Sequence, residues 1–349
     1  MEKKLNLIFL IVMIFTPIVH GENKELSDLC KDRKYVELEK ICRAMLKSDP
    51  NNAEVYHYLG ASLYSQHKDK EAFQYVEKAY KLAPENGLYH INLARVYYRI
   101  GDYKKCIAIC KEDIKKFGDH PYPRYLIAAS KFRSNLITLD EVIKELESIV
   151  KALPEHHVYV CLYTDLADFY LMKKSYTSAI YYLSKALKYE SKNEYLYVCR
   201  GNAYMVLQDY AKAIDNFTTV TLLNSNHKTI DADFSYAFQM SGKYEEALKY
   251  MDKAIIKNPD DKYLLVRKSG ILRLMGKYKE AIQLLEEVEK IDLIKNKDIA
   301  ATIYFELGEN YFDINEFKKA KTYFKKSLKN NRNNSFITQR INYIDKKNQ

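Results

Sequence analysis

The chain has few of the residues that interrupt regular structure, and it has no tryptophan. Its 349 residues include only ten glycines and seven prolines. Because sheet-rich proteins depend on such residues for their turns, this scarcity favours long helices over sheets. The lack of tryptophan leaves large aromatic packing to 32 tyrosines and 14 phenylalanines. A tyrosine can bury its ring while its hydroxyl stays in water, which suits a thin protein with much surface.

Signatures of catalysis and cofactor binding are also missing. The sequence contains no glycine-rich phosphate loop, no H-E-x-x-H motif, no nucleophile elbow and no four-cysteine zinc spacing. It therefore predicts no catalytic residue, no metal site and no cofactor. The formal charge of +10 is a modest excess without a concentrated basic stripe. For that reason we expect no nucleic-acid partner.

The first 21 residues have the pattern of a secretory signal peptide. Two lysines near the start precede an apolar run from Leu7 to Phe15, which is short for a membrane span. We expect cleavage near Gly21, export to the periplasm or cell envelope, and no integral membrane span in the mature protein. Two alternatives stay open: the lumen of a secretory pathway, and an N-terminal anchor if the leader is not cleaved.

A period of 34 residues organises the rest of the chain. Tyrosines recur at this step in "KSYTSAI", "QDYAKAI", "GKYEEAL" and "GKYKEAI", and an alanine follows each of them by three residues. Four residues after each alanine comes a large apolar residue, at Leu183, Phe217, Met251 and Leu285. Apolar residues at steps of three and four give each predicted helix one apolar face. Such a helical pair cannot bury that face alone, so neighbouring pairs must stack.

This pattern resembles the tetratricopeptide repeat, in which each unit is a pair of helices. A half-matched unit around Tyr35 precedes units that begin near Ala53, Gly87, Tyr122, Val160, Glu194, Lys228, Lys262 and Ala301. The resemblance implies an all-α fold, a right-handed α-solenoid of about nine helix-turn-helix repeats over residues 22–333. Residues 334–349 are expected to form a capping helix and a tail, since a stacked array needs its open end covered.

Two segments depart from the period. The unit at about 122–154 has a longer turn around Asn135 to Asp140, and Val142 stands where other units have alanine. Between the last two units the step grows from 34 to 39, and a joint at about 291–300 supplies the extra length. We expect a hinge or a change of curvature at both places.

The six cysteines are read against the same register. Cys106 and Cys110 take the alanine and large apolar positions of their unit, so we expect them to pack in the core and not to bind metal. Cysteines four apart on a helix are also too distant to bond to each other. Two other pairings, Cys30 with Cys42 and Cys161 with Cys199, stay open in an oxidising compartment.

The family resemblance also implies a binding groove, lined by the first helix of each unit. The register places a basic, then acidic, then basic run of side chains there, with tyrosines between them: Arg95, Tyr98, Arg99, Arg133, Asp165, Asp168, Tyr195, Asn202, Asp233, Tyr236, Tyr263, Arg267 and Arg273. Such a surface suits a protein or peptide partner of mixed charge. Membrane association through that partner stays open.

The resemblance thus predicts a non-enzymatic scaffold or adaptor in the secretory or cell-envelope space, which binds a peptide segment of a partner protein in its groove. The alternative is a lumenal or periplasmic chaperone or co-chaperone that holds unfolded clients. The chain has no His-Pro-Asp motif of the kind that many co-chaperones carry. Suppressed aggregation of unrelated denatured proteins would distinguish the chaperone from the scaffold.

Overall fold

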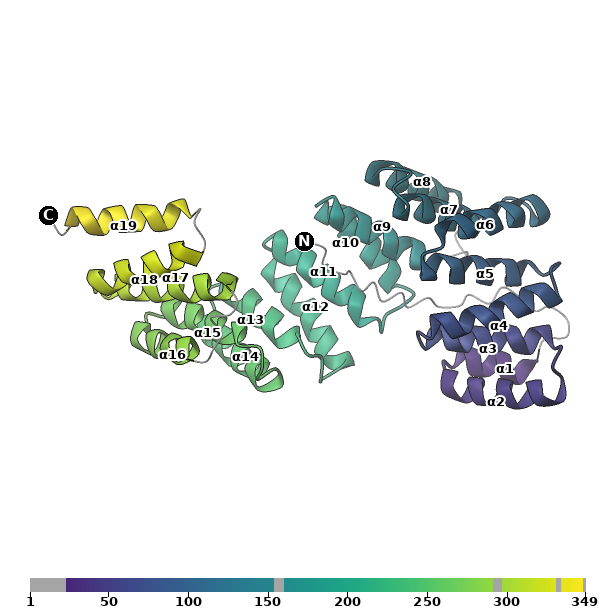
Figure 1. The fold of residues 1–349 in the computed structure, drawn as a ribbon, viewed down its shortest axis with the longest axis horizontal. Coiled ribbons are helices and arrows are strands. Elements are labelled where there is room, and N and C mark those ends of the chain that lie inside the picture. The colour runs from purple at the N-terminus through teal and green to yellow at the C-terminus, as the bar shows by residue number, and fades with distance from the viewer. Residues whose placement is uncertain (1–22, 154–159, 291–296, 331–333, 348–349) are drawn as a thin grey trace. The chain divides into compact units, whose positions relative to one another are not determined.

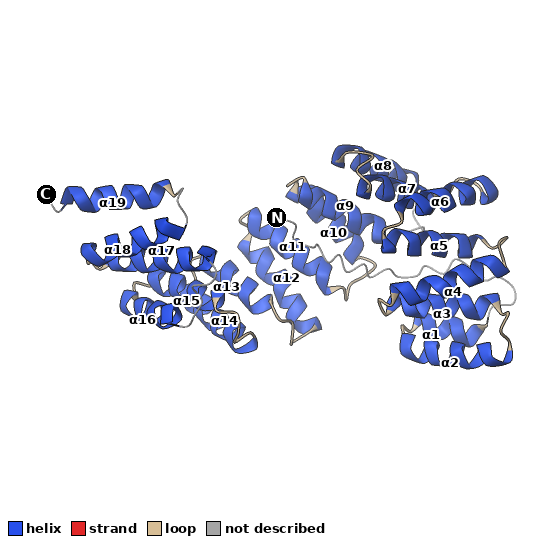
Figure 2. Ribbon diagram, in the orientation of Figure 1, coloured by secondary structure: helices blue, strands red, loops and turns tan. Residues whose placement is uncertain are grey.

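The computed structural model describes residues 23–153, 160–290, 297–330 and 334–347. All regular secondary structure in these ranges is helical (Figure 2). The chain divides into two compact units, residues 1–191 and residues 192–349, and each is described separately. The all-α class that the sequence predicts is confirmed.

The described residues of the first unit form five helical pairs, coloured purple to teal in Figure 1. Their helices are α1 (Lys24–Lys31), α2 (Tyr35–Ser48), α3 (Ala53–Ser65), α4 (Asp69–Leu82), α5 (Gly87–Ile100), α6 (Tyr103–Phe117), α7 (Pro121–Arg133), α8 (Leu139–Ala152), α9 (Val160–Met172) and α10 (Tyr176–Leu187).

In the second unit, the part of the chain that the structure describes forms four helical pairs and a single last helix, coloured teal to yellow. Its helices are α11 (Glu194–Val206), α12 (Tyr210–Leu223), α13 (Ile230–Met240), α14 (Tyr244–Lys257), α15 (Tyr263–Leu274), α16 (Tyr278–Lys290), α17 (Lys297–Asp313), α18 (Phe317–Asn330) and α19 (Ser335–Lys347). The first helices of the pairs begin within a few residues of the starts that the 34-residue period predicts.

The core of each pair depends on the apolar face of its second helix. The small residues at the alanine position are fully buried: Ala72, Cys106, Ala179, Ala213, Ala247, Ala281 and Ala320. The apolar residues that follow these positions by four residues, Cys110 among them, are buried as well. Cys106 and Cys110 therefore occupy the packing positions predicted for them, and all six cysteines are free thiols in this structure.

Close approach of the two helices in a pair requires a residue without a large side chain on the first helix. At Gly201, an added Cβ would lie 2.4 Å from the ring of Phe217, which is far inside van der Waals contact. Gly60 meets Val76 in the same way, at 2.5 Å. The glycine backbone of the first helix thus forms the surface on which the buried side chain of the second helix rests.

The turn inside every described pair contains one residue with left-handed backbone torsions. These residues are Arg33, His67, Gly101, Asn135, Lys174, Gln208, Gly242, Gly276 and Asn315. Left-handed torsions cost non-glycine residues roughly 1–2 kcal/mol. Only three of the nine turns contain glycine. In the other six, the residue after the left-handed one donates a backbone hydrogen bond to a carbonyl of the first helix, as Lys68 does to Leu63 at 2.9 Å, which closes the turn in this conformation.

Helix α19 covers the end of the second unit. Its Ile337 and Ile344 are buried in one cluster with Leu307 and Phe324 of the last helical pair. On the same helix Arg340 donates two hydrogen bonds of 3.0 Å to the carboxylate of Glu309. The last helix therefore acts as the predicted cap.

Several predicted features fall wholly or partly outside the described residues. The leader, residues 1–21, is one of them, and so are residues 291–296 of the predicted joint. Residues 297–300 of that joint already belong to α17. In the irregular unit, the turn from Asn135 to Asp140 ends in a capping box formed by Thr138 and Glu141. Within the described ranges, no helix is both long enough and apolar enough to span a bilayer.

Candidate functional site

In the first unit, the predicted groove residues lie on the first helices of three consecutive pairs. Arg95, Tyr98 and Arg99 come from α5, Arg133 ends α7, and Asp165 and Asp168 come from α9. The structure brings together Tyr98, Arg133 and Asp165, which lie 32 or more residues apart in sequence, since each perturbs the titration of another. These three predicted residues thus form one cluster, whereas their role in a binding groove stays a prediction.

Asp165 is the centre of this cluster and is almost completely buried, with 2% of its surface exposed. The Tyr125 hydroxyl donates a hydrogen bond of 2.8 Å to its Oδ2. Burial and the nearby charge of Asp168 raise the pKa of Asp165 to about 7, although the Tyr125 hydrogen bond and Arg133 act to lower it. A buried carboxyl beside a second carboxyl favours its protonated form.

Tyr98 and Arg133 are the two members of the cluster that are less buried than Asp165. Burial, followed by the charge of Asp165, raises the pKa of Tyr98, whereas Arg133 acts to lower it. The Tyr98 ring also packs against Tyr103 with ring centroids 5.7 Å apart. Arg133 is the exposed member of the cluster, so it is the residue that a partner could reach.

Arg99 is held by contacts within the first unit. Its Nε lies 2.9 Å from Asp69 Oδ1, and its Nη1 donates to the backbone carbonyl of Tyr64 at 3.0 Å. The guanidinium carbon lies 4.2 Å above the centre of the Tyr64 ring. These contacts satisfy the charge of Arg99 and fix its position on α5.

Arg95 lies deeper on the same helix, with 8% of its surface exposed. Its guanidinium lies 5.1 Å from the centre of the Tyr64 ring, and its Nη1 donates to Asn92 Oδ1 at 3.2 Å. No ion pair joins Arg95 to a described carboxylate. A buried cation without an anionic partner is unusual, because desolvation of a charge is costly.

In the second unit, a more open group of predicted residues lies on α13 and α15. Tyr236 and Tyr263 expose 46% and 48% of their surfaces. Arg267 lies 5.9 Å from the Tyr236 ring centre and donates a 3.0 Å hydrogen bond to the carbonyl of Ala232. Burial raises the pKa of Asp233 to about 6, and the charge of Arg267 acts against this shift. Two exposed rings, a cation and a half-buried acid thus gather on neighbouring first helices.

Arg273 belongs to a separate ionic network between α15 and α17. Its Nη1 lies 3.3 Å from Asp313 Oδ2 and 3.8 Å from Glu309 Oε2, and its Nε lies 3.6 Å from Glu306 Oε2. Burial raises the pKa of Glu306, Arg273 acts to lower it, and the other two acids raise it further. Arg273 therefore joins two pairs of the second unit.

Tyr195 and Asn202, the remaining predicted residues, lie on α11. Tyr195 is half-buried, and Asn202 is exposed.

Sequence reasoning missed several residues of these clusters, namely His57, Tyr64, Asn92, Tyr122, Tyr125, Glu306, Glu309, Asp313 and Arg340. One signal was available for the acids of α17, since Glu306, Glu309 and Asp313 follow helical spacing along one face. His57 and Asn92 gave no such signal. Their sequence positions do not reveal that their side chains meet at 3.0 Å.

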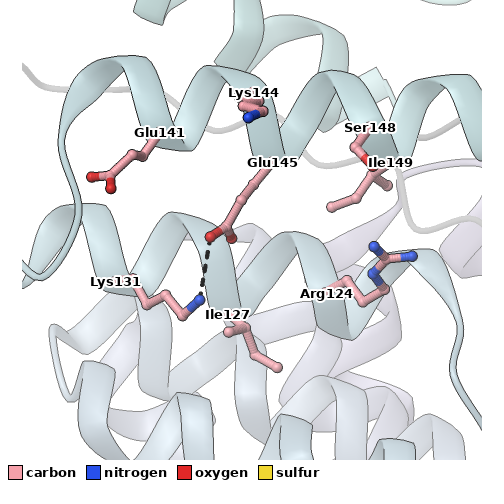
Figure 3. A pocket seen from close by; sticks show the side chains of 8 residues that line it. All are labelled: Arg124, Ile127, Lys131, Glu141, Lys144, Glu145, Ser148 and Ile149. Atoms are coloured by element: carbon pink, nitrogen blue, oxygen red, sulfur yellow. Dashed lines mark hydrogen bonds and ion pairs between the residues drawn. The ribbon is translucent and has the colours of Figure 1, made fainter.

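A hollow lies between α7 and α8, and none of the predicted groove residues lines it. Figure 3 shows its lining, with Lys131 and Glu145 pointing toward each other across the two helices. Their charged atoms are 3.3 Å apart. The hollow measures about 560 Å³ and has three basic and two acidic side chains in its wall. This mixture of charges points to no particular ligand.

Among the described residues, no group of three or more histidine, cysteine, aspartate or glutamate side chains could hold a metal ion. The clusters described above are built of arginine, tyrosine and carboxyl groups. Such groups can form hydrogen bonds and ion pairs with a polypeptide.

Comparison with protein families gives matches to the tetratricopeptide repeat in three places. Three models of this repeat match residues 63–129, 232–292 and 263–333. A TPR repeat-containing protein of Methanocaldococcus jannaschii is 23% identical over 175 residues, which cover 49% of this chain and 31% of that protein. The chain thus spans about a third of the length of this curated relative.

Solved structures show the same fold. The C-terminal part of a TPR repeat-containing protein from Cytophaga hutchinsonii matches with a TM-score of 0.57 and 14% identity, over 72% of this chain and 99% of that chain. A chain of the APC/C hetero-tetramer Cut9-Hcn1 matches with a TM-score of 0.55 and 18% identity, over 71% of this chain and 47% of that chain. The chain therefore contains tetratricopeptide repeats at residues 63–129 and 232–333, and its other described helical pairs follow the same register.

Proposed function

We propose that this protein is a scaffold or adaptor that binds a peptide segment of a partner protein on the first helices of its repeats, in the secretory or cell-envelope space. The repeat fold is typically that of a non-catalytic scaffold for protein interactions. The observation that carries the proposal is the pair of exposed rings of Tyr236 and Tyr263, with the half-buried Arg267, on α13 and α15. Tyrosine and arginine are the side chains that most often dominate binding energy at protein interfaces.

The geometry of this group favours binding over mere solvation. Arg267 is fixed by its bond to the Ala232 carbonyl and by its position against Tyr236, so it loses little conformational freedom when a partner binds. Asp233 supplies an acid on the preceding first helix. A partner segment with both charges and an apolar anchor would satisfy all four side chains, and we take such a segment as the ligand.

The test begins with a photo-crosslinking residue in place of Tyr236, in cells that make the protein. A captured partner is then purified, and its affinity is measured for the wild type and for a variant with Tyr236→Ser and Tyr263→Ser. Loss of two central aromatic anchors should weaken binding about 30-fold or more, corresponding to about 2 kcal/mol.

The matched control is a variant with Tyr181→Ser and Tyr189→Ser. These tyrosines are as exposed as the first pair, at 55% and 54%, but they lie on and just after the second helix α10. Equal affinity for the wild type, the test variant and the control would contradict the proposed surface. Suppression of aggregation of unrelated denatured proteins, unaffected by either variant, would favour the chaperone alternative.

The proposed location is supported by the sequence of residues 1–21 alone. Mass analysis of the N-terminus, combined with fractionation of the native cell, tests it. The proposal expects a mature chain that starts near residue 22 in an exported fraction. A chain that keeps Met1 and stays in the cytoplasm would contradict it.

A further inference from the structure

The positive charge of the chain is concentrated at its C-terminal end. Residues 317–349 contain ten lysines and arginines but only one acid, Asp345, whereas the whole chain has 56 basic and 46 acidic residues. This segment therefore carries a net charge of +9 out of the +10 of the chain, and residues 1–316 are almost neutral. The expectation from the sequence that the chain has no concentrated basic stripe is wrong for this end of it.

Lysines form almost the whole exposed face of α18, the second helix of the last pair. The exposed residues of this helix are Lys318, Lys319, Thr322, Lys325, Lys326 and Lys329. The helix contains no acidic residue. Its opposite face is buried through Ala320, Phe324 and Ser327. Packing of that face fixes the lysines on the solvent side of the helix.

Three of these lysines have no carboxylate to balance their charge. Each of the other two exposed lysines has an acidic partner, at 2.9 and 3.1 Å. Among the described residues, no carboxylate forms an ion pair with Lys318, Lys325 or Lys329. These three are spaced by seven and four residues, so they lie on one stripe of the helix. The stripe extends for about 16 Å along the helix axis.

The end of α19 adds cations and aromatic rings beside this face. Lys321 of α18 pairs with the one acid of α19, and Lys347 Nζ lies 4.7 Å from the centre of the Phe317 ring. These contacts hold the last turn of α19 beside the first turn of α18, and Figure 1 shows the two as the last helices of the second unit. On α19, Phe336 and Tyr343 expose 45% and 50% of their surfaces. Exposed aromatic rings beside lysines are typical of protein surfaces that meet lipid headgroups.

We propose that the lysine face of α18, together with the end of α19, binds the anionic headgroups of a lipid membrane. A lysine ammonium is a point charge without the bidentate geometry of arginine, so a face of lysines recognises density of negative charge and not one molecular shape. Protein interfaces, in contrast, are depleted in lysine. Because the three unpaired lysines lie on one stripe, all of them can reach a flat anionic surface at the same time.

The membrane face and the proposed partner surface use different helices of the second unit. The partner surface lies on α13 and α15, whereas the lysines lie on α18. Neither surface uses the residues of the other, and the membrane face does not depend on the leader. Attachment through α18 would hold the proposed scaffold at a membrane while a partner binds.

Co-sedimentation of the full chain with lipid vesicles tests the proposal. Vesicles of phosphatidylcholine alone are compared with vesicles that also contain phosphatidylglycerol. The wild type should bind the anionic vesicles more tightly, and sodium chloride should weaken this binding. A variant with Lys318→Gln, Lys325→Gln and Lys329→Gln should bind them about 100-fold more weakly, because each lysine near an anionic surface contributes about fivefold.

The matched control removes the same charge from three exposed lysines of α6, by Lys104→Gln, Lys111→Gln and Lys115→Gln. These lysines have the same spacing and the same repeat positions, with Cys106 in place of Ala320. The control should keep the affinity of the wild type. All three proteins have the same N-terminus, so a retained leader contributes equally to each. Equal weakening in both variants, or equal binding to both kinds of vesicle, overturns the proposal. Binding to duplex DNA or to polyglutamate without binding to anionic vesicles overturns it as well.

Discussion

At the residue scale, the most consequential finding is that the predicted groove residues differ in accessibility. Arg95 and Asp165 are buried under neighbouring helices, whereas Tyr236 and Tyr263 are about half exposed. All four follow the same family register. In the first unit, tyrosines of the flanking helices, such as Tyr64 and Tyr125, cover the polar side chains. The same positions can thus serve the core in one unit and a surface in the other.

Asp165 makes the stability of the first unit depend on pH. Below about pH 4 this carboxyl is protonated in both the folded and the unfolded chain. Between about pH 4 and pH 7 only the folded chain keeps the proton, because its pKa is raised to about 7. The folded state then binds more protons, so the free energy of unfolding falls as the pH rises through this window. The loss amounts to at most about 4 kcal/mol and is complete above pH 7.

Asp165→Asn should remove most of this dependence, because an amide keeps an acceptor for the Tyr125 hydroxyl and does not titrate. Urea unfolding of the first unit, followed from pH 4 to pH 8, measures it. We expect a flatter profile than that of the wild type and a more stable variant at pH 8. Asp215→Asn, at an exposed acid of α12, is the control and should leave the profile unchanged. A wild-type profile without a decline over this window would disprove the assignment.

At the element scale, helix positions followed from the sequence far better than side-chain contacts did. The 34-residue step located the helical pairs because a stacked array repeats one packing solution. The same step could not reveal the His57–Asn92 contact, because these residues are 35 apart and their meeting depends on the rotation of α3 and α5. The cap was predictable as a helix. The ion pair between Arg340 of this helix and Glu309 could not be predicted, because it depends on where the two side chains lie in the folded structure.

Two substitutions at left-handed turn residues and one control inside a helix should change the free energy of unfolding with different signs. Gln208→Gly should stabilise the chain by about 0.5–1 kcal/mol, since its φ of 60° costs a non-glycine residue more than glycine loses in entropy. Gly242→Ala should destabilise it by about 1 kcal/mol, because φ is 77° there although the space around it is open. Gly270→Ala is the control inside α15, where space is also open and no positive φ occurs, and it should stabilise. Chemical denaturation of the three variants measures these values, and one common sign would contradict the backbone explanation.

At the scale of the whole molecule, the division into two compact units has a consequence for cooperativity. In repeat arrays each pair is stabilised mainly by its immediate neighbours. The second unit has its own cluster around Phe217 and Phe234 and its own cap. A local loss of stability should therefore stay within the unit in which it arises.

Phe217→Ala tests this independence, and its effect should be large because the ring is fully buried against Gly201. Removal of such a ring costs about 3–5 kcal/mol. Hydrogen exchange of the full chain, read by mass spectrometry, should then show faster exchange in α11 to α14 and unchanged exchange in α1 to α8. Leu222→Ala on the same helix is the matched control, because 82% of Leu222 is exposed and its loss should change little. If exchange rose equally in both units for Phe217→Ala, the two units would unfold together as one cooperative array. A ligand that binds one unit would then also stabilise the other unit against unfolding.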